Sequence, residues 1–155
     1  MRHTLAILAI SLAAAGWASS VHAQSHGHTM MTPSELKWVD APALPRGAKT
    51  AVLEGPPGEG KAFTTRLSMP ANYKFPPHVH PHTERLTVLS GTFYLGMGER
   101  FDESKLHALP TGGMAVMAPG TPHFAITKEP TVLQLHGVGP VGIRYLDPKD
   151  DPRNQ

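Results

Sequence analysis

Three histidines and one glutamate lie within the seven-residue segment HVHPHTE, which runs from His78 to Glu84. His78 and His80 are two residues apart, and side chains with this spacing point to the same side of an extended chain. Their imidazole nitrogens can therefore bind one ion at about 2.0–2.1 Å. The spacing predicts a pair of metal ligands, and a pair of exposed loop histidines is the competing interpretation of so short a motif.

Glu84 has the same parity as the two histidines, but a straight strand would place it ~13 Å beyond His80 at ~3.3 Å per residue. Ligands of one ion must lie within about twice the metal–ligand distance. A shared site therefore requires a bend at residues 81–83, where Pro81 fixes φ and cannot extend a central strand ladder. The bend would put His82 at the tip of a turn, outside the ligand set.

His123 is a fourth candidate ligand, because it opens a strand-like run just after the tight turn at Pro119 and Gly120. A hairpin of this kind can bring a histidine to the first cluster from a neighbouring strand. Histidine with carboxylate is the ligand set of non-haem iron and related metals. The chain has no cysteine, so a transition-metal site must be built from these residue types.

The first 23 of the 155 residues have the order of a secretory signal peptide. Arg2 supplies the positive charge, residues 5–15 are apolar, and Val21 and Ala23 are the small residues before a cleavage site at Ala23–Gln24. A buried N-terminal helix is the alternative. The pattern predicts a periplasmic or secreted protein, and the remaining residues suffice for one domain.

The charge and hydropathy of the sequence argue against a nucleic-acid partner and against a membrane-spanning segment. The formal net charge is only +2, and the basic residues are scattered along the chain. Without a basic cluster we expect no nucleic-acid partner. After residue 23, no segment is apolar for long enough to cross a membrane, so we expect no membrane span.

Short strands separated by Gly- and Pro-rich turns must position the candidate ligands. We expect strands at 50–53, 62–69, 84–90, 92–95, 114–118, 123–127, 131–137 and 142–146. Residues 99–107 look helical, and residues 33–40 can form either a helical turn or an edge strand. The pattern predicts an all-β sandwich or barrel at 50–147, after a flexible leader and edge segment at 24–49 and before a tail at 148–155.

The first cluster resembles the motif G-x5-H-x-H-x3,4-E-x6-G of the cupin superfamily. His78, His80, Glu84 and Gly91 occupy their positions in that motif. The leading glycine is replaced by Asn72, a loop residue that does not touch the ligands.

The downstream segment resembles the second cupin motif, G-x5-P-x-G-x2-H-x3-N. Gly112, Gly120 and His123 keep their spacing, Pro119 is displaced by one place, and Thr127 stands where the motif has asparagine. Matching four ligand types at these spacings identifies the chain as similar to small single-domain bacterial cupins.

The resemblance implies a jelly-roll β-barrel, often a homodimer, with a divalent transition metal inside. It implies His78, His80, Glu84 and His123 as the ligands, and it leaves the metal open among Mn, Fe, Ni, Zn and Cu. Such a ligand set leaves one or two coordination positions for a substrate or O2.

Gln134 and His136 share one face of the expected strand at 131–137. That face either turns into the barrel, where both residues would hydrogen-bond to the metal ligands, or forms a polar stripe in solvent.

We therefore expect an exported metal-binding cupin. It is either a metal-dependent enzyme, dioxygenase-like or isomerase-like, on a small organic substrate, or a non-catalytic module that binds or senses a small ligand or metal. A structural barrel with an empty site is a third alternative. No catalytic residue is predicted beyond the ligands.

Overall fold

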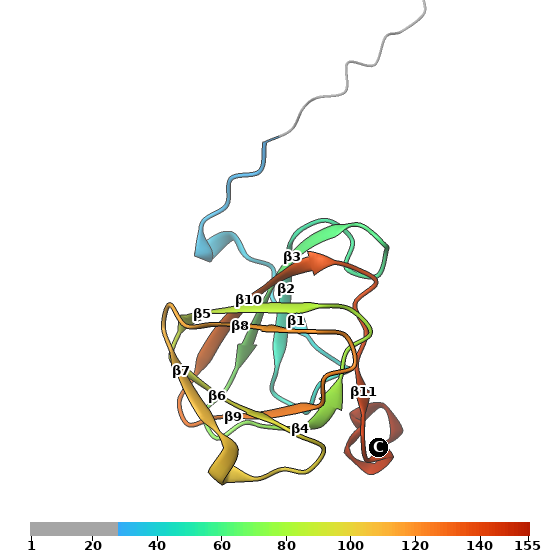
Figure 1. Ribbon diagram of the computed structural model, residues 1–155. Helices are drawn as coiled ribbons and strands as arrows, with labels where there is room; N and C mark the ends of the chain where they lie inside the picture. The colour runs from blue at the N-terminus through green and yellow to red at the C-terminus, as the bar shows by residue number, and fades with distance from the viewer. Residues whose placement is uncertain (1–27) are drawn as a thin grey trace, which may run out of the picture.

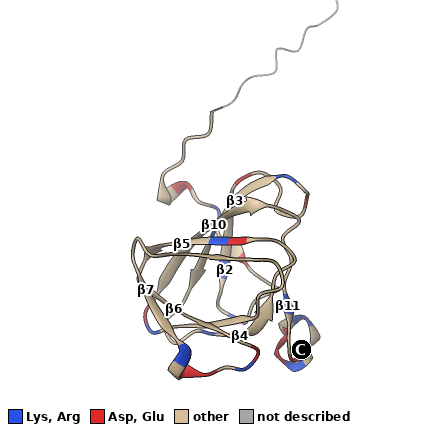
Figure 2. Ribbon diagram, viewed as in Figure 1, with Lys and Arg blue, Asp and Glu red and all other residues tan. Residues whose placement is uncertain are grey.

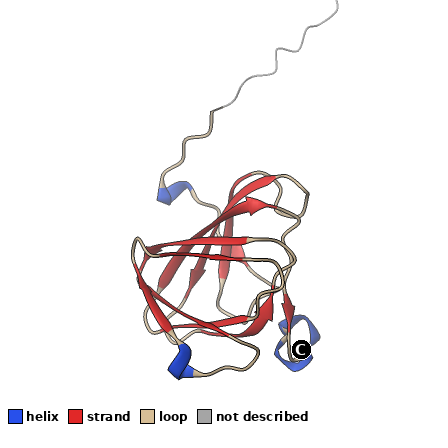
Figure 3. Ribbon diagram, viewed as in Figure 1, coloured by secondary structure: helices blue, strands red, loops and turns tan. Residues whose placement is uncertain are grey.

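The structure of the protein is a computed structural model that describes residues 28–155 (Figure 1). The predicted signal peptide and cleavage site lie outside the described residues. Two antiparallel sheets face each other and close into a barrel (Figures 1 and 3). The first sheet has the order β1 (Val39–Asp40), β2 (Lys49–Glu54), β3 (Ala62–Met69), β10 (Thr131–Val138), β5 (Glu84–Ser90), β8 (Met114–Met117). The second has the order β11 (Arg144–Tyr145), β4 (Lys74–Val79), β9 (His123–Thr127), β6 (Thr92–Met97), β7 (His107–Pro110).

The all-β jelly-roll prediction is confirmed, and β3, β5 and β9 begin and end where the sequence predicts. Helical structure in the described residues is limited to short 3-10 turns (Figure 3). They are η1 (Pro33–Glu35), η2 (Glu103–Lys105), η3 (Pro148–Asp150) and η4 (Pro152–Asn154). The expected helix at 99–107 is wrong, because only η2 forms there and β7 begins at His107.

Strand β4 was not predicted, because its Pro76 and Pro77 read as loop residues. Proline lacks the N–H that a strand ladder needs, so inside a sheet it is confined to edges and irregular positions. The ladder between β4 and β9 shifts register between Phe75 and His78, and both prolines fall in this interval. The irregularity lets β4 remain an inner strand and deliver His78 next to β9.

Two backbone positions explain features of the cupin-like motifs. Gly91 has a φ of 74° where the chain passes from β5 to β6, and a Cβ there would lie 2.6 Å from the carbonyl oxygen of Pro130. Asn72, which replaces the leading glycine, has a φ of 57°. Asparagine is among the few residues other than glycine that tolerate this left-handed region. The substitution therefore keeps the conformation that the turn requires.

Thr127 replaces the terminal asparagine of the second motif and is buried. Its hydroxyl donates to the carbonyl oxygen of Pro70 at 2.6 Å and accepts the N–H of Tyr73 at 3.3 Å. The side chain thus fastens the loop before β4 to the end of β9.

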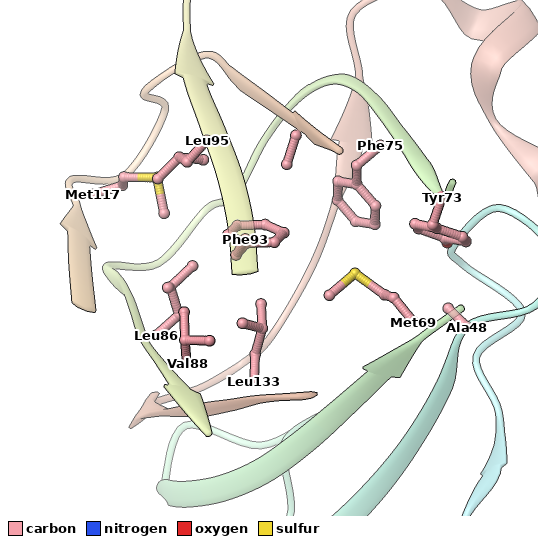
Figure 4. Packing of buried hydrophobic residues seen from close by; sticks show 11 residues of the cluster. Ala48, Met69, Tyr73, Phe75, Leu86, Val88, Phe93, Leu95, Met117 and Leu133 are labelled. Atoms are coloured by element: carbon pink, nitrogen blue, oxygen red, sulfur yellow. The ribbon is translucent and has the colours of Figure 1, made fainter. Parts of the chain in front are cut away.

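A hydrophobic core lies between the two sheets and extends to the candidate ligands, since the ring of the core residue Phe75 lies 4.3 Å from that of His78, between centroids. Side chains from β3, β5, β6 and β10 point toward one another in Figure 4, including Met69, Leu86, Val88, Phe93 and Leu133. Each such side chain, when fully buried, contributes about 1.5–3 kcal/mol of transfer free energy. This packing holds in place the strands that carry the candidate ligands.

The segments before and after the predicted barrel also pack on it. Residues 41 and 44 contact the core, and the sheet begins at β1 rather than at residue 50. The Tyr145 hydroxyl donates to the carbonyl oxygen of Ala43 at 2.9 Å, and the Tyr73 hydroxyl donates to that of Pro45 at 2.6 Å. Residues 148–155, expected as a tail, form η3 and η4.

Charged residues of both signs alternate in the loop between β6 and β7 and around the C-terminal turns (Figure 2). None of the helical segments in residues 28–155 has the length and apolar character that a membrane crossing needs.

Candidate metal centre

Two of the candidate ligands are cross-strand neighbours. His78 near the end of β4 pairs in register with His123 at the start of β9, and their ring centroids lie 4.1 Å apart. The two residues are 1% and 4% exposed. Paired residues on one face of an antiparallel ladder lie close together, so the β4–β9 register itself brings these imidazoles to one point.

His80 reaches the same point from outside the ladder. It follows the end of β4, and the chain bends at residues 81 and 82 before β5 begins with Glu84, as the distance argument required. The Gly120 N–H donates to the His80 carbonyl oxygen at 2.8 Å, which ties this bend to the turn before His123. The His80 ring lies 4.9 Å from that of His78 and 5.2 Å from that of His123, measured between centroids.

Each of the three imidazoles makes a hydrogen bond from Nδ1 to a backbone carbonyl oxygen. The bonds join His78 to Pro76 (2.7 Å), His80 to Gly142 (2.6 Å) and His123 to Thr121 (3.0 Å). A carbonyl oxygen can only accept, so Nδ1 carries the proton and Nε2 of the neutral ring presents a lone pair. Carbonyl groups commonly orient metal-binding histidines in this way.

Glu84 places a carboxylate against two of these lone pairs. Its Oε2 lies 3.2 Å from Nε2 of His123 and 3.4 Å from Nε2 of His80, and the residue is 8% exposed. In the described part of the chain, Oε2 of Glu84 and Nε2 of His80 are buried without a hydrogen-bond partner. Buried acceptors that face each other are unfavourable unless something positive lies between them.

A proton on one imidazole would satisfy only part of this arrangement, whereas a metal cation would satisfy all the lone pairs at once. Ligands held at ~2.1 Å from one ion in tetrahedral or octahedral geometry lie about 3.0–3.4 Å apart, close to the Glu84 distances. One ligand atom from each of His78, His80 and His123 lies within 4.8 Å of the others, so the three histidines could hold a metal ion. The residues present fit a metal.

The protonation states favour metal binding as well. Burial, with the neighbouring imidazoles of His123 and His80, lowers the pKa of His78 to about 2. Burial opposes the charged form of Glu84, but contact with His123 and the imidazoles of His80 and His82 outweighs it, and the pKa of Glu84 is lowered. A neutral imidazole and an ionised carboxylate are the forms that bind metals.

A cavity of about 340 Å³ opens onto the cluster. His78, His80, Glu84 and His123 all line it, together with residues of β2, β3, β5, β6 and β10. Residues 41–44, residues 141–143 and Arg153 also line it, and the solvent exposure of Pro42, Val141 and Arg153 marks this side as the mouth of the cavity. The site therefore has a chamber in which a small molecule can reach the ligand atoms.

The structure does not bring Gln134 and His136 to the cluster. Leu133 and Leu135 face the cavity, so the alternating neighbours on β10 lie on the outer face of the sheet. Gln134 accepts a hydrogen bond from Nε of Arg66 at 3.3 Å, and His136 is exposed. Their expected role beside the metal ligands is corrected to the alternative, a polar stripe on the outside.

His82 lies at the bend, as predicted, and does not join the three histidines. Its ring packs 5.4 Å from that of His80 and edge-on to Phe63 at 6.1 Å, between centroids. Burial is the main reason that the pKa of His82 is lowered.

Sequence reasoning missed the groups that orient the ligands. The accepting carbonyl oxygens of Pro76, Thr121 and Gly142 are backbone atoms, which leave no residue-type signal. The carbonyl groups of Pro76 and Thr121 each lie two residues before the histidine that they orient. This two-residue spacing was the only sequence signal that could have indicated them. Gly142 is distant in sequence from His80 and had no clue of this kind.

Comparisons with known proteins agree with this architecture. A family model described as the ChrR cupin-like domain matches residues 26–140. The fold is similar to that of the polyketide cyclase RemF from Streptomyces resistomycificus, with a TM-score of 0.67 and 19% identity over 83% of this chain and 92% of that chain. It is also similar to a candidate acetylacetone dioxygenase from Methylibium petroleiphilum PM1, with a TM-score of 0.61 and 16% identity over 81% and 85% of the two chains.

An RmlC-like cupin from Shewanella frigidimarina NCIMB 400 has a TM-score of 0.56 and 14% identity, over 71% of this chain and 89% of that one. At these identities the similarity shows the fold alone. A search of curated proteins finds no match.

Proposed function

The chain belongs to the family of ChrR cupin-like domains, and on that premise we propose that it is an exported metal-dependent protein acting on a small organic substrate. One observation carries the proposal. Three imidazoles, each fixed by a carbonyl oxygen at Nδ1, aim their Nε2 atoms at one point beside a buried carboxylate. That point faces a cavity large enough for a small molecule.

We propose His78, His80, Glu84 and His123 as the residues that hold the ion, which is one of Mn, Fe, Ni, Zn or Cu. When bound, a divalent ion with open coordination positions supplies Lewis-acid chemistry or a site for O2 or water. The four side chains set its position, and the carbonyl acceptors keep the rings from turning away. The apolar walls orient a substrate and limit the water around it.

The residues around the cavity bear on the type of chemistry. Apart from the four proposed ligands, Arg153 is the only residue with an ionisable side chain among the described residues that line it. A mechanism that needs a separate acid or base has no candidate on these walls. This favours dioxygenase-like or isomerase-like chemistry centred on the ion. The same absence supports the second candidate, a non-catalytic module that binds or senses a ligand in this pocket.

Metal analysis tests the proposed site. We expect about one equivalent of a transition metal in protein purified without chelators, and almost none in the His78→Ala variant, which loses a ligand from the strand ladder. Less than about a tenth of an equivalent in both proteins would contradict the metal site and favour a structural barrel.

Oxygen consumption distinguishes the enzyme from the binding module. The metal-loaded protein would be supplied with phenols, diketones and thiols while dissolved O2 is recorded, and product analysis would reveal isomerisation without O2 uptake. Turnover that disappears in His78→Ala supports the enzyme. Binding without turnover of any member of the panel supports the second candidate.

Export rests on the sequence of residues 1–23 alone. We expect intact-mass spectrometry of the protein from a periplasmic or culture fraction to show a chain that begins at Gln24. A chain that retains Met1 and stays in the cytoplasmic fraction would contradict export.

Homodimer formation also stays a proposal. Strand β8 is an edge of the first sheet, and Met114 and Val116 on it are 58% and 54% exposed. Uncharged apolar edges favour association with another strand. Light scattering of the purified protein measures the mass directly, and a monomer at all concentrations would contradict the dimer.

A further inference from the structure

The C-terminal segment from residue 141 onward lies beyond residues 26–140, the part of the chain that the family model matches. It nevertheless contacts two of the proposed metal ligands. Tyr145 of β11 pairs in register with His78, and the Gly142 carbonyl oxygen accepts the Nδ1 proton of His80 at 2.6 Å. Residues of this segment also line the cavity, and Figure 1 shows its strand β11 beside the end of β4. The segment is therefore part of the site.

The loop at residues 141–143 is fastened to the barrel at both ends. The Val141 N–H donates to the carbonyl oxygen of Pro57 at 2.7 Å. After the loop, β11 pairs with β4, and the Leu146 N–H donates to the carbonyl oxygen of Pro77 at 2.9 Å. None of these bonds involves a residue beyond 146. Changes in the last residues of the chain should therefore leave both ends of the loop in place.

Two successive carbonyl groups join this loop to side chains outside it. The first, that of Gly142, holds the imidazole of His80. The second, that of Ile143, accepts a hydrogen bond from Nη2 of Arg153 at 3.2 Å. Arg153 thus restrains the peptide group that directly follows the one orienting a proposed metal ligand.

Asp151 holds the guanidinium of Arg153 in the orientation that this bond requires. Its Oδ1 accepts from Nε at 2.8 Å, and its Oδ2 accepts from Nη2 at 2.6 Å. Paired hydrogen bonds of this kind fix the plane of a guanidinium. The side chains of Arg153 and Asp151 are 47% and 15% exposed. The pair is oriented but accessible to solvent, so its one bond to the loop can open without disturbing the barrel.

From these contacts we infer that Arg153 is a positioning residue for the metal centre, and that the Arg153–Asp151 pair is a clasp at the mouth of the cavity. The closed clasp holds the loop so that the Gly142 carbonyl oxygen keeps Nε2 of His80 directed at the ion. The open clasp frees the loop, and one ligand of the ion loses its restraint. The clasp therefore slows release of the metal. The inference rests on the proposed metal site.

The release rate of Co²⁺ measures the clasp. The purified chain is loaded with Co²⁺ and mixed with a saturating chelating dye, and its visible spectrum before mixing reports the coordination of the ion. We expect Arg153→Ala to release Co²⁺ about ten-fold faster, the lower range for disturbing the groups that orient a metal ligand. We also expect an altered Co²⁺ spectrum, because the His80 imidazole is less restrained.

Lys149→Ala is the matched control. It removes the same charge from the neighbouring turn η3, where Lys149 is exposed and does not line the cavity. We expect its release rate to lie within about two-fold of that of the unmodified chain, with an unchanged Co²⁺ spectrum.

Asp151→Asn opens the clasp while Arg153 stays in the chain. Asparagine can still accept the Arg153 backbone N–H that Asp151 accepts at 3.0 Å, but the ionic contact with the guanidinium is lost. We expect Co²⁺ release about three-fold faster than in the unmodified chain. This variant decides the question alone if Arg153→Ala does not fold, and a release rate equal to that of the unmodified chain would then overturn the clasp.

Denaturant unfolding of the metal-free variants separates positioning from stabilisation. If Arg153 only stabilised the C-terminal turns, Arg153→Ala would lower the unfolding midpoint and leave the Co²⁺ spectrum and release rate unchanged. Equal release rates and equal spectra in Arg153→Ala and Lys149→Ala would overturn the clasp and leave the metal site standing. An unmodified chain that takes up no Co²⁺ would overturn the metal site itself.

Discussion

His78 and His123 reach the candidate metal centre by a different route from His80. The first two are paired in register on neighbouring strands, and the carbonyl oxygens that orient them lie two residues earlier in the same chain segment. His80 lies beyond the strand end, and its ring is oriented by Gly142, which is 62 residues away in sequence.

Two of the imidazoles are therefore oriented by residues close to them in sequence, whereas the third is oriented by a tertiary contact. A strand ladder fixes two imidazoles with the rigidity of the sheet, whereas the third depends on a loop at the mouth of the cavity. Residues 141–143 line that mouth, so a bound molecule touches the same loop that orients His80. The ladder pair therefore sets where the ion lies, and the His80 side of the site can respond to what enters.

Removal of a ladder ligand should have the largest effect. We expect His123→Ala to lower metal affinity by more than about 100-fold, beyond the usual cost of losing an orienting group, because a ligand itself is lost. Competition with a chelating dye measures the affinity. His107→Ala is the matched control, since His107 is exposed on β7. Equal losses in the two variants would contradict the assignment.

Glu84→Gln should produce two opposite changes. We expect metal affinity to fall roughly 10–100-fold, because the carboxylate charge is lost. In the metal-free protein the amide can donate to Nε2 of His123, now 3.2 Å from an acceptor oxygen, so the free energy of unfolding should rise by about 1 kcal/mol. Denaturant unfolding after chelation checks the second change. A variant that loses stability without the metal would show that Glu84 is there to hold the fold.

Gly142→Ala tests the tertiary side of the comparison. An added Cβ would lie 3.1 Å from Cγ and 3.4 Å from Cδ of Pro81, so either Pro81 or the Gly142 loop must move by a few tenths of an ångström. Pro81 directly follows His80, so either movement displaces the Gly142 carbonyl oxygen relative to the His80 ring. We expect metal affinity to fall about ten-fold, the lower range for loss of an orienting group.

The Co²⁺ spectrum should change in the same variant, because a turned imidazole alters the coordination geometry. Gly58→Ala is the control, since a Cβ there meets nothing within 4 Å. An unchanged spectrum and affinity in Gly142→Ala would mean that the loop does not orient His80.

His136→Ala should have the smallest effect. The residue is exposed on the outer face of β10, so we expect metal affinity within about two-fold of the unmodified chain. A larger loss in dye competition would show that the outer face of this strand communicates with the site.

The sequence predicted most of the fold and the residues of the site. Alternating strands and turn residues gave the all-β architecture, and the distance between His80 and Glu84 required the bend that is present at residues 81 and 82. Strand β4 was missed because its two prolines normally exclude an inner strand, and only the register shift opposite β9 accommodates them.

The errors at the candidate site have a common cause in tertiary packing. Period-two alternation places Gln134 and His136 on one face of a strand, but it cannot tell which face meets the other sheet. The carbonyl oxygen of Gly142 and the side chain of Arg153 approach the cavity only after distant segments have packed. Neither the periodicity of the sequence nor the residue type at positions 142 and 153 predicts these two contacts.

The most direct test of the central claim is anomalous diffraction from crystals of the metal-loaded protein, recorded at the absorption edge of the bound metal. We predict one strong peak between the Nε2 atoms of His78, His80 and His123, at about 2.0–2.2 Å from each and within the same range of Oε2 of Glu84. A loaded crystal whose anomalous peaks all lie elsewhere, with these four side chains left unbound, would contradict it.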